Sequence, residues 1–145
     1  MKYVKDHPLM LDADYEYTAK DGDCKYDPSK GVGTVSDYKE IGAKSQEAMQ
    51  AALNDGLVSV AIEGDLLQFY DEGIITVSDC EGWEELNHAV LAIGYGTDDE
   101  TGMDYFIIKN SWGEDWGEKG YFRTEAEKDG AGPCGIQSEP SQPFA

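Results

Sequence analysis

The sequence predicts an α+β domain in which short strands outnumber helices and pair into an antiparallel sheet or barrel. Three observations support this class. The chain has 145 residues, 40% of them hydrophobic and 11% aromatic, which suits one globular domain with a buried core. Its 17 Gly and 9 Tyr are typical of a sheet with many turns. The apolar runs of its second half are short, closely spaced and separated by turn residues.

The first part of the chain, residues 1–33, is polar and rich in turn formers, and we expect it to be an extended segment. Residues 20–23 read Lys-Asp-Gly-Asp and residues 26–29 read Tyr-Asp-Pro-Ser, which favour loops. The remaining residues, 34–145, are expected to form the β-rich domain.

One helix and a buried strand are expected next. Residues 45–55 predict a helix, because Ser45 can cap its start, Gly56 can end it, and apolar residues recur along one face. Residues 57–62 read Leu-Val-Ser-Val-Ala-Ile, an aliphatic run typical of a buried strand. Residues 65–70 predict a short helical turn.

Strands dominate the remainder. They are predicted at residues 88–96, 105–109 and 120–123. The acidic segment 97–102 between the first two is expected to be a hairpin loop. Short turns between these strands favour antiparallel pairing.

The chain is strongly acidic, with a formal net charge of −19. Such a chain repels nucleic acid and anionic membranes, so neither is an expected partner. The excess of carboxylates indicates solubility or adaptation to an acidic compartment. No apolar run is long enough to span a membrane, and the first residues lack the features of a signal peptide. The chain is therefore expected to be cytosolic or a mature piece of a longer protein.

Two segments carry most of the chemistry. His88 lies in the run Leu-Asn-His-Ala-Val-Leu-Ala-Ile-Gly-Tyr-Gly, and Asn110 lies in Tyr-Phe-Ile-Ile-Lys-Asn-Ser-Trp-Gly. A lone histidine among apolar residues is more often structural than catalytic. These two segments, however, resemble in order and spacing the histidine and asparagine motifs of the papain and cathepsin L family of cysteine proteases. Further similarity extends over nearly the whole chain, with Glu16 standing where the family usually has proline.

The resemblance implies the right-hand, β-barrel-like domain of the papain fold, with short helices and with the left-hand helical domain absent from this sequence. Residues 1–33 would then cross to the left-hand domain. His88 would be the general acid/base that takes a proton from a cysteine thiol, and Asn110 would orient its ring. Trp112 would shield this pair from water.

The family's nucleophilic cysteine and its Cys-Gly-Ser-Cys-Trp signature do not occur in this sequence. The resemblance implies that a left-hand domain, in the same precursor or as a separate chain, supplies the nucleophile. Cys80 and Cys134 match a family disulfide, which would close a loop of about 55 residues and stabilise the fold by roughly 4 kcal/mol. Cys24 matches a cysteine whose usual partner lies in the left-hand domain, which accounts for the odd number of cysteines.

Substrate contacts are also implied by the resemblance. Glu139 matches the base of the S2 pocket, where a carboxylate would accept arginine as well as hydrophobic side chains; the alternative is a solvated carboxylate. The other substrate-binding positions would be Ala61, Leu86, Asn87 and Ala89. No cofactor is expected, because the scattered Cys and His do not form a zinc site, and neither a calcium loop nor a dinucleotide fingerprint is complete.

Two functions remain open from the sequence. In the first, the chain is the C-terminal half of a cysteine endopeptidase that acts on peptide or protein substrates and is inactive alone. In the second, it is a catalytically dead binding or structural protein derived from such a protease. A domain meant to pair exposes an apolar face, which would promote self-association. The resemblance implies a lysosomal, vacuolar or extracellular location.

Overall fold

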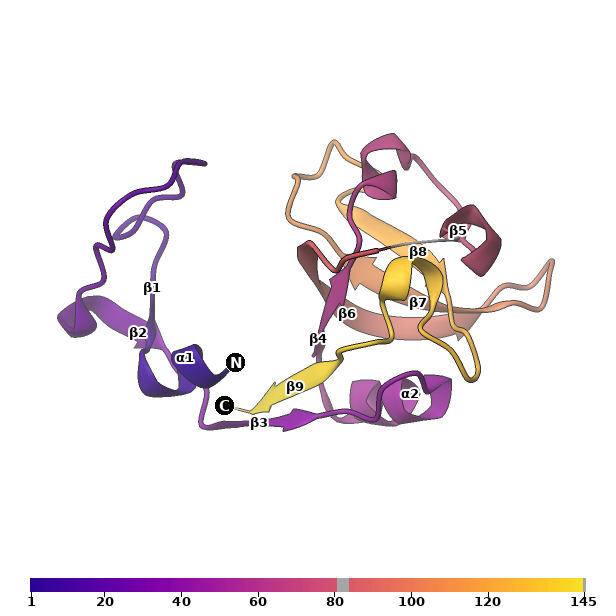
Figure 1. Cartoon of the computed structure of the whole chain (residues 1–145), viewed down its shortest axis with the longest axis horizontal. Coiled ribbons are helices and arrows are strands. Elements are labelled where there is room, and N and C mark those ends of the chain that lie inside the picture. The colour runs from indigo at the N-terminus through magenta and orange to yellow at the C-terminus, as the bar shows by residue number, and fades with distance from the viewer. Residues whose placement is uncertain (81–83, 145) are drawn as a thin grey trace. The chain divides into compact units, whose positions relative to one another are not determined.

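The computed structural model describes residues 1–80 and 84–144. It contains two compact units, Met1–Lys39 with Pro143–Ala145 and Glu40–Gln142 (Figure 1). Within the described residues, no helix is long and apolar enough to cross a membrane.

The first unit has little regular structure, but it is not extended throughout. Residues Lys2–Asp6 form the helix α1, so the expectation of an extended segment is wrong there. Strand β1 (Leu9–Met10) pairs antiparallel with β2 (Gly31–Gly33), and the 3-10 helix η1 (Pro28–Lys30) precedes β2. The helix was missed because five residues with one aliphatic side chain among them carry no apolar periodicity. The Tyr3 ring stacks on the ring of His7, the residue that follows this helix, with centroids 4.3 Å apart.

Strands β4 to β8 of the second unit belong to the larger sheet, whose strand order within the described residues is β3-β9-β4-β6-β7-β8-β5. The order is linear, so these strands do not form a closed barrel, and the sheet with few helices agrees with the expected β-rich domain. The strands are β3 (Asp37–Glu40), β4 (Val58–Ile62), β5 (Ile74–Ile75), β6 (His88–Thr97), β7 (Asp104–Lys109), β8 (Tyr121–Glu125) and β9 (Ser141–Phe144).

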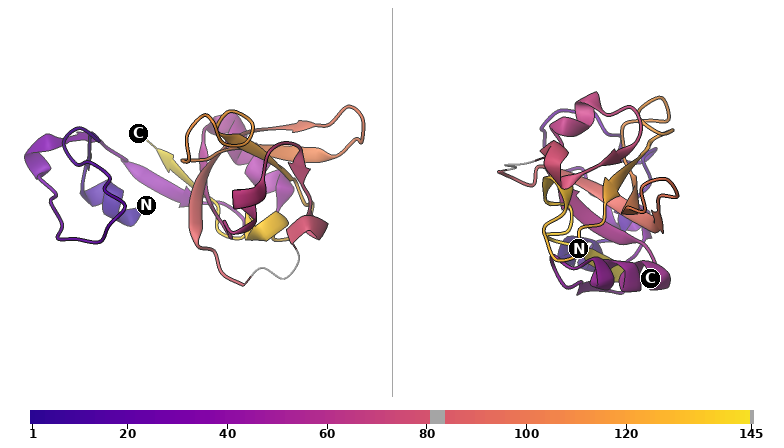
Figure 2. Two further views of the ribbon diagram at one scale, coloured as in Figure 1. Left: turned by 90° about the horizontal axis from the view of Figure 1, so that it is seen from above. Right: turned by 90° about the vertical axis from the view of Figure 1, so that its right-hand side faces the viewer.

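Pairing in this sheet is mainly antiparallel, as the short turns predict. The longest hairpin joins β6 to β7 and extends away from the other strands in the left-hand view of Figure 2. Its register runs from Leu91 opposite Lys109 to Thr97 opposite Asp104. Strand β7 then pairs antiparallel with β8. The exception is β5, which pairs parallel with β8, because the chain reaches it from the far side of the sheet through a long connection.

The helix α2 (Gln46–Asp55) forms as the sequence predicts. The Ser45 hydroxyl accepts a hydrogen bond from the backbone N–H of Ala48, and Gly56 follows the last turn. Met49 and Ala52 are buried where the helix contacts β4 and β6. The expected helical turn after β4 is the 3-10 helix η2 (Leu66–Phe69).

The core lies where α2, η2 and the inner face of the sheet meet. Alternate residues of β4 point into it: Val58, Val60 and Ile62 are buried, whereas Ser59 and Ala61 lie on the other face. The largest fully buried apolar side chains are those of Phe106, Phe122, Met49, Ile62, Leu67, Ile108 and Ile136. The two remaining 3-10 helices, η3 (Val77–Cys80) and η4 (Pro133–Gly135), are joined by the Cys80–Cys134 disulfide.

Candidate active site

His88 is the first residue of β6, and it lies opposite Ile62, the last residue of β4. The chain packs tightly behind it. A Cβ atom at Gly64 would lie only 2.9 Å from the Cβ atom of His88, so a larger residue there would displace the histidine. The Asn87 side chain fixes this contact, because its Oδ1 accepts a hydrogen bond of 2.8 Å from the Gly64 N–H.

Asn110 reaches His88 from the end of β7. The distance between His88 Nε2 and Asn110 Oδ1 is 2.8 Å. Oδ1 also accepts the backbone N–H of Ser111 at 2.8 Å, which identifies this atom as the amide oxygen, because an amide nitrogen could not accept that bond. An oxygen acceptor requires the proton of a neutral His88 to sit on Nε2, so the lone pair of Nδ1 is left to accept a proton.

Asn110 itself is held firmly. Its side chain is buried, and its backbone N–H donates to the carbonyl of Gly120 at 3.0 Å. Within the described part of the chain, the amide Nδ2 has no hydrogen-bond partner. The burial of one end of the His88–Asn110 bond lowers its local dielectric and strengthens it.

Trp112 covers the pair. Its ring centroid lies 5.0 Å from that of His88, with an angle of 30° between the planes. Trp112 is 40% exposed, so it remains partly open to solvent while it packs on the imidazole. Trp116 supports it from the side, since the two indole centroids are 5.2 Å apart and nearly perpendicular. Such edge-to-face contacts between aromatic rings are favourable.

Sequence reasoning missed several residues that build this site. Trp116 donates its indole N–H to the carbonyl of Leu67 at 3.1 Å, and its ring also packs on Tyr70 and Phe122. Glu118 and Arg123 form a partly buried ion pair beside these rings. The sequence offered a signal, because Trp, Gly, Glu and Tyr recur at close spacing in residues 112–121, but their contacts depend on η2 and β8.

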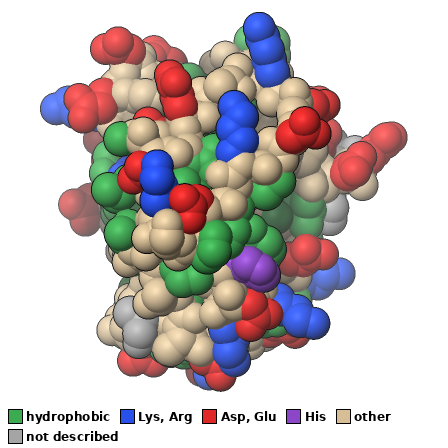
Figure 3. Space-filling model, turned by 90° about the vertical axis from the view of Figure 1, so that its left-hand side faces the viewer, with side chains coloured by type: hydrophobic (Ala, Val, Ile, Leu, Met, Phe, Trp, Pro, Cys, Tyr) green, Lys and Arg blue, Asp and Glu red, His purple; other side chains and the backbone are tan. Residues whose placement is uncertain are grey.

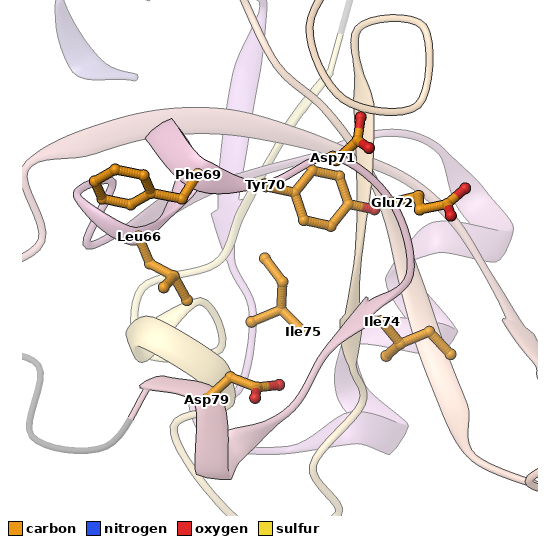
Figure 4. A pocket seen from close by; sticks show the side chains of 8 residues that line it. All are labelled: Leu66, Phe69, Tyr70, Asp71, Glu72, Ile74, Ile75 and Asp79. Atoms are coloured by element: carbon orange, nitrogen blue, oxygen red, sulfur yellow. The ribbon is translucent and has the colours of Figure 1, made fainter.

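Two cavities flank these elements. One of about 300 Å³ lies on the outer face of the sheet, beside Asn110, and it is lined by Ser59, Ala89, Val90, Leu91, Lys109, Asn110 and Ser111. The other, of about 360 Å³, lies between η2 and the segment after it (Figure 4). There Leu66, Tyr70 and Ile75 surround the hollow, and the carboxylates of Asp71 and Glu72 point away from it.

Charged side chains of both signs are spread over the face of the molecule that Figure 3 shows, and apolar side chains lie between them. The described residues contain no group of three or more His, Cys, Asp or Glu side chains that could hold a metal ion. The arrangement therefore offers a proton acceptor held by an amide and covered by indole rings.

Comparison with known proteins assigns the chain to one family. Residues 1–144 match the sequence model of the papain family cysteine proteases. The chain belongs to the papain family.

Relatives in this family match almost the whole chain. A cathepsin L-like proteinase of Phaedon cochleariae is 39% identical over 144 residues, which cover 99% of this chain and 43% of that protein. Procathepsin L of Felis catus is 40% identical over 147 residues, which cover 98% of this chain and 43% of that protein. The chain thus spans less than half the length of these curated relatives.

Solved structures of the family have the same fold. The digestive procathepsin L 3 of the Tenebrio molitor larval midgut superposes with a TM-score of 0.85 at 38% identity, covering 99% of this chain and 46% of the other. The bromelain protease of Ananas comosus, in complex with the E64 inhibitor, gives 0.81 at 32% identity, covering 99% and 66%. The papain-like fold and the C-terminal position of this chain within it are thereby established.

The cysteines of this papain-family chain fall into two classes. Cys80 and Cys134 form the disulfide that the family resemblance implied. Cys24 is exposed and is not part of a disulfide. No cysteine lies among the residues that contact His88 through the interactions described above.

The implied substrate-binding residues occupy more than one place. Ala61 and Ala89 are paired across β4 and β6 and share the outer face of the sheet. Asn87 is exposed apart from its bonds to Gly64 and Asp65, and Leu86 is half-buried beside it. Glu139 is exposed, and it does not line the cavity that contains Ala89.

Proposed function

We propose that this chain is the C-terminal half of a papain-family cysteine endopeptidase and that it supplies the proton-transfer residues for peptide-bond hydrolysis. The observation that carries the proposal is the 2.8 Å contact of His88 Nε2 with Asn110 Oδ1, which leaves Nδ1 as the proton acceptor. A left-hand domain that bears the nucleophilic cysteine, from the same precursor or from a separate chain, completes the site.

In the proposed reaction His88 both accepts and donates a proton. Nδ1 takes the proton of the cysteine thiol, and the resulting imidazolium stabilises the thiolate. The thiolate attacks the peptide carbonyl and forms a C–S bond. The imidazolium then gives its proton to the departing amine as the C–N bond breaks. In the second half, Nδ1 takes a proton from water, whose oxygen attacks the thioester and releases the acid and the thiol.

Asn110 and Trp112 act on this cycle by holding the ring. Asn110 Oδ1 can only accept a hydrogen bond, so it stabilises His88 whenever Nε2 carries a proton, which it does in both charge states. Trp112 lies over the ring and limits the access of water to the His88–Asn110 bond. Residue roles of this kind predict that the two side chains affect turnover more than substrate affinity.

The chain also contributes substrate specificity in this proposal. Glu139 lies at the base of the S2 pocket of the assembled enzyme, with Ala61, Leu86 and Ala89 as its apolar walls and Asn87 beside the catalytic histidine. A carboxylate at the base of an apolar pocket pairs with arginine, while the walls still accept leucine. The exposure of Glu139 in this chain supports the proposal, because its carboxylate is available to a ligand.

The proposed partners and location follow from the same site. Residues 1–33 would cross to the left-hand domain, and residues 34–145 would form the right-hand domain with the catalytic histidine and asparagine. The Cys80–Cys134 disulfide favours an oxidising, lysosomal, vacuolar or extracellular environment.

Peptidase activity tests the proposal. The chain is mixed with a papain-family left-hand domain at mildly acid pH, with Leu-Arg and Arg-Arg fluorogenic peptides and a mild reductant. Activity is expected only in the mixture, and His88→Ala should lower it on the order of 10²- to 10⁴-fold. Gln68→Ala, at an exposed position of the second unit, is the control and should leave it unchanged. A complex that forms but is as inactive as its His88→Ala variant would show that the chain works by binding instead.

Specificity is tested in the same mixture. Glu139→Ala should lower kcat/KM for the Arg-Arg peptide and leave kcat/KM for the Leu-Arg peptide nearly unchanged. Equal losses on the two peptides would exclude a role for Glu139 in the S2 pocket.

A further inference from the structure

A partly buried ion pair next to the turn that carries Trp116 has no part in the proposed reaction. Arg123, on β8, makes a bidentate ion pair with Glu118: its Nε lies 3.1 and 3.0 Å from the two carboxylate oxygens, and one terminal nitrogen lies 2.6 Å from Oε1. Each side chain is 28% exposed. Bidentate pairs with limited exposure hold a defined geometry far better than exposed ion pairs do.

The ion pair closes the turn that carries Trp116. Within this turn the Gly120 N–H donates to the carbonyl of Trp116 at 2.7 Å, and the Glu118 N–H donates to the carbonyl of Tyr121 at 2.9 Å. Gly117 has a φ of +53°, and a Cβ atom there would lie 2.8 Å from the Tyr121 carbonyl oxygen. These contacts restrain the turn, and Arg123 joins it to β8 through Glu118.

The same turn reaches the candidate active site along two routes. Through Gly120, its carbonyl accepts the backbone N–H of Asn110 at 3.0 Å. Through Trp116, it sets the edge on which the Trp112 indole packs, and Trp112 in turn lies on His88. A displacement of the turn would therefore move both the amide that orients His88 and the indole that covers it.

Glu118 also ties this turn to the segment after η2. Its Oε1 accepts the Gly73 N–H at 3.0 Å, and the Tyr70 hydroxyl donates to the Gly73 carbonyl at 2.8 Å. The Tyr70 oxygen accepts the Arg123 backbone N–H at 3.3 Å, and its ring packs on Trp116 at 5.5 Å between centroids. One carboxylate thus joins β8, the Trp116 turn and the loop at Gly73.

We propose that Glu118 and Arg123 are positioning residues whose ion pair holds Trp112, Trp116 and Asn110 in register with His88. The inference rests on the proposed function for its catalytic meaning, although the packing it describes belongs to this chain alone. In this proposal the ion pair acts on the site through the turn, and neither side chain contacts the His88 imidazole or the substrate.

The charge of Glu118 suits this task. Burial alone would raise the pKa of its carboxyl, but hydrogen bonds from Arg123 and from the Gly73 N–H outweigh burial, and the pKa lies below its ordinary value. The carboxylate therefore stays ionised, and paired, in the mildly acid range in which a papain-family enzyme of this kind would be assayed.

Nuclear magnetic resonance on this chain tests the proposal without catalysis. In Glu118→Gln, hydrogen exchange of the Trp116 indole N–H should speed up by roughly tenfold or more, as expected when a hydrogen-bonded charge is lost. The ring signals of His88 should also shift as Trp112 moves. Glu114→Gln, in the same segment but exposed, should change neither signal.

A second variant and a stability control separate positioning from general destabilisation. Arg123→Lys keeps the charge but loses the bidentate geometry, and it should reproduce both changes in milder form should Glu118→Gln fail to fold. Ser45→Ala weakens the chain at the distant cap of α2 and should leave both signals in place. Unchanged Trp116 and His88 signals in folded Glu118→Gln or Arg123→Lys would overturn the proposal.

Activity of the assembled enzyme separates this inference from the proposed function. In the mixture with a left-hand domain, Glu118→Gln should lower kcat with little change in KM. Loss of the packing signals in a complex that never hydrolyses peptide would support the positioning role and refute the catalytic one. A normal kcat together with altered packing would show that the ion pair does not affect catalysis.

Discussion

Gln137 offers the sharpest test of how this fold is held together. Its side chain is fully buried (0% exposed) and fastens the loop between β8 and η4. Oε1 accepts the Glu127 N–H at 2.8 Å, and Nε2 donates to the carbonyls of Glu127 at 2.7 Å and of Gly130 at 3.3 Å. We change Gln137 to Met, which has a similar volume and can make none of these bonds.

The size of the effect follows from the groups left behind. Three backbone groups lose their partner, and an unsatisfied buried group costs about 1–3 kcal/mol. Glu127 and Gly130 are only half-buried, so water replaces part of each bond and the low end of that range applies. The variant should therefore lose about 2–4 kcal/mol of unfolding free energy, or roughly 5–15 °C in Tm.

Urea and thermal unfolding, followed by circular dichroism, measure this loss. Gln68→Met is the matched control, because Gln68 is exposed on η2, and it should change stability by less than about 0.5 kcal/mol. A Gln137→Met protein no less stable than the control would refute the reasoning, since it would show that water satisfies the loop as well as the buried amide does.

Three further predictions concern other parts of the molecule. Replacing Cys80 and Cys134 together by Ser should cost about 4 kcal/mol, because their bond spans 54 residues, and an unfolding midpoint unaffected by the change would contradict this. Phe122→Ala should cost about 3–5 kcal/mol in thermal unfolding, whereas Phe69→Ala, at an 86% exposed site, should cost less than about 0.5 kcal/mol. The pKa of Glu118 is lowered on folding, so its stabilisation is present above the unfolded pKa and disappears as pH falls through the folded pKa. The difference in unfolding free energy between the wild type and Glu118→Gln should therefore shrink as pH falls. A difference that grows as pH falls would contradict this prediction.

Much of the second unit could be predicted because its local patterns agree with its packing. The helix at residues 45–55 has a cap, a stop and an apolar stripe, and it forms as α2, Gln46–Asp55. The apolar run within residues 88–96 predicts a strand, and it forms as β6, His88–Thr97, one residue longer. The contact of His88 with Asn110 could be anticipated only from the family resemblance, since 22 residues separate them and no local pattern pairs them.

The features that could not be predicted lack a local sequence pattern, and most of them depend on contacts between distant residues. The helix α1 lacks an apolar face, so no periodicity marked it. The parallel pairing of β5 with β8 joins Ile74 to Arg123, and such a pairing depends on a connection of many residues. The Glu118–Arg123 pair could not be predicted, because nothing in the local sequence shows that these two charges meet in a partly buried ion pair.

The position of β9 has a consequence for the order of events in folding. The β6–β7 hairpin closes a short loop, with Thr97 opposite Asp104, and such local closure is fast. Strand β9 instead meets β4 at Ser59 and Ser141, and Gln142 donates to the Ala52 carbonyl across 90 residues. Distant closures of this kind slow folding, so amides of the hairpin should gain protection from hydrogen exchange before those of β9 during refolding. Until then one edge of β4 lies open, and an open strand edge is where two nascent copies would meet.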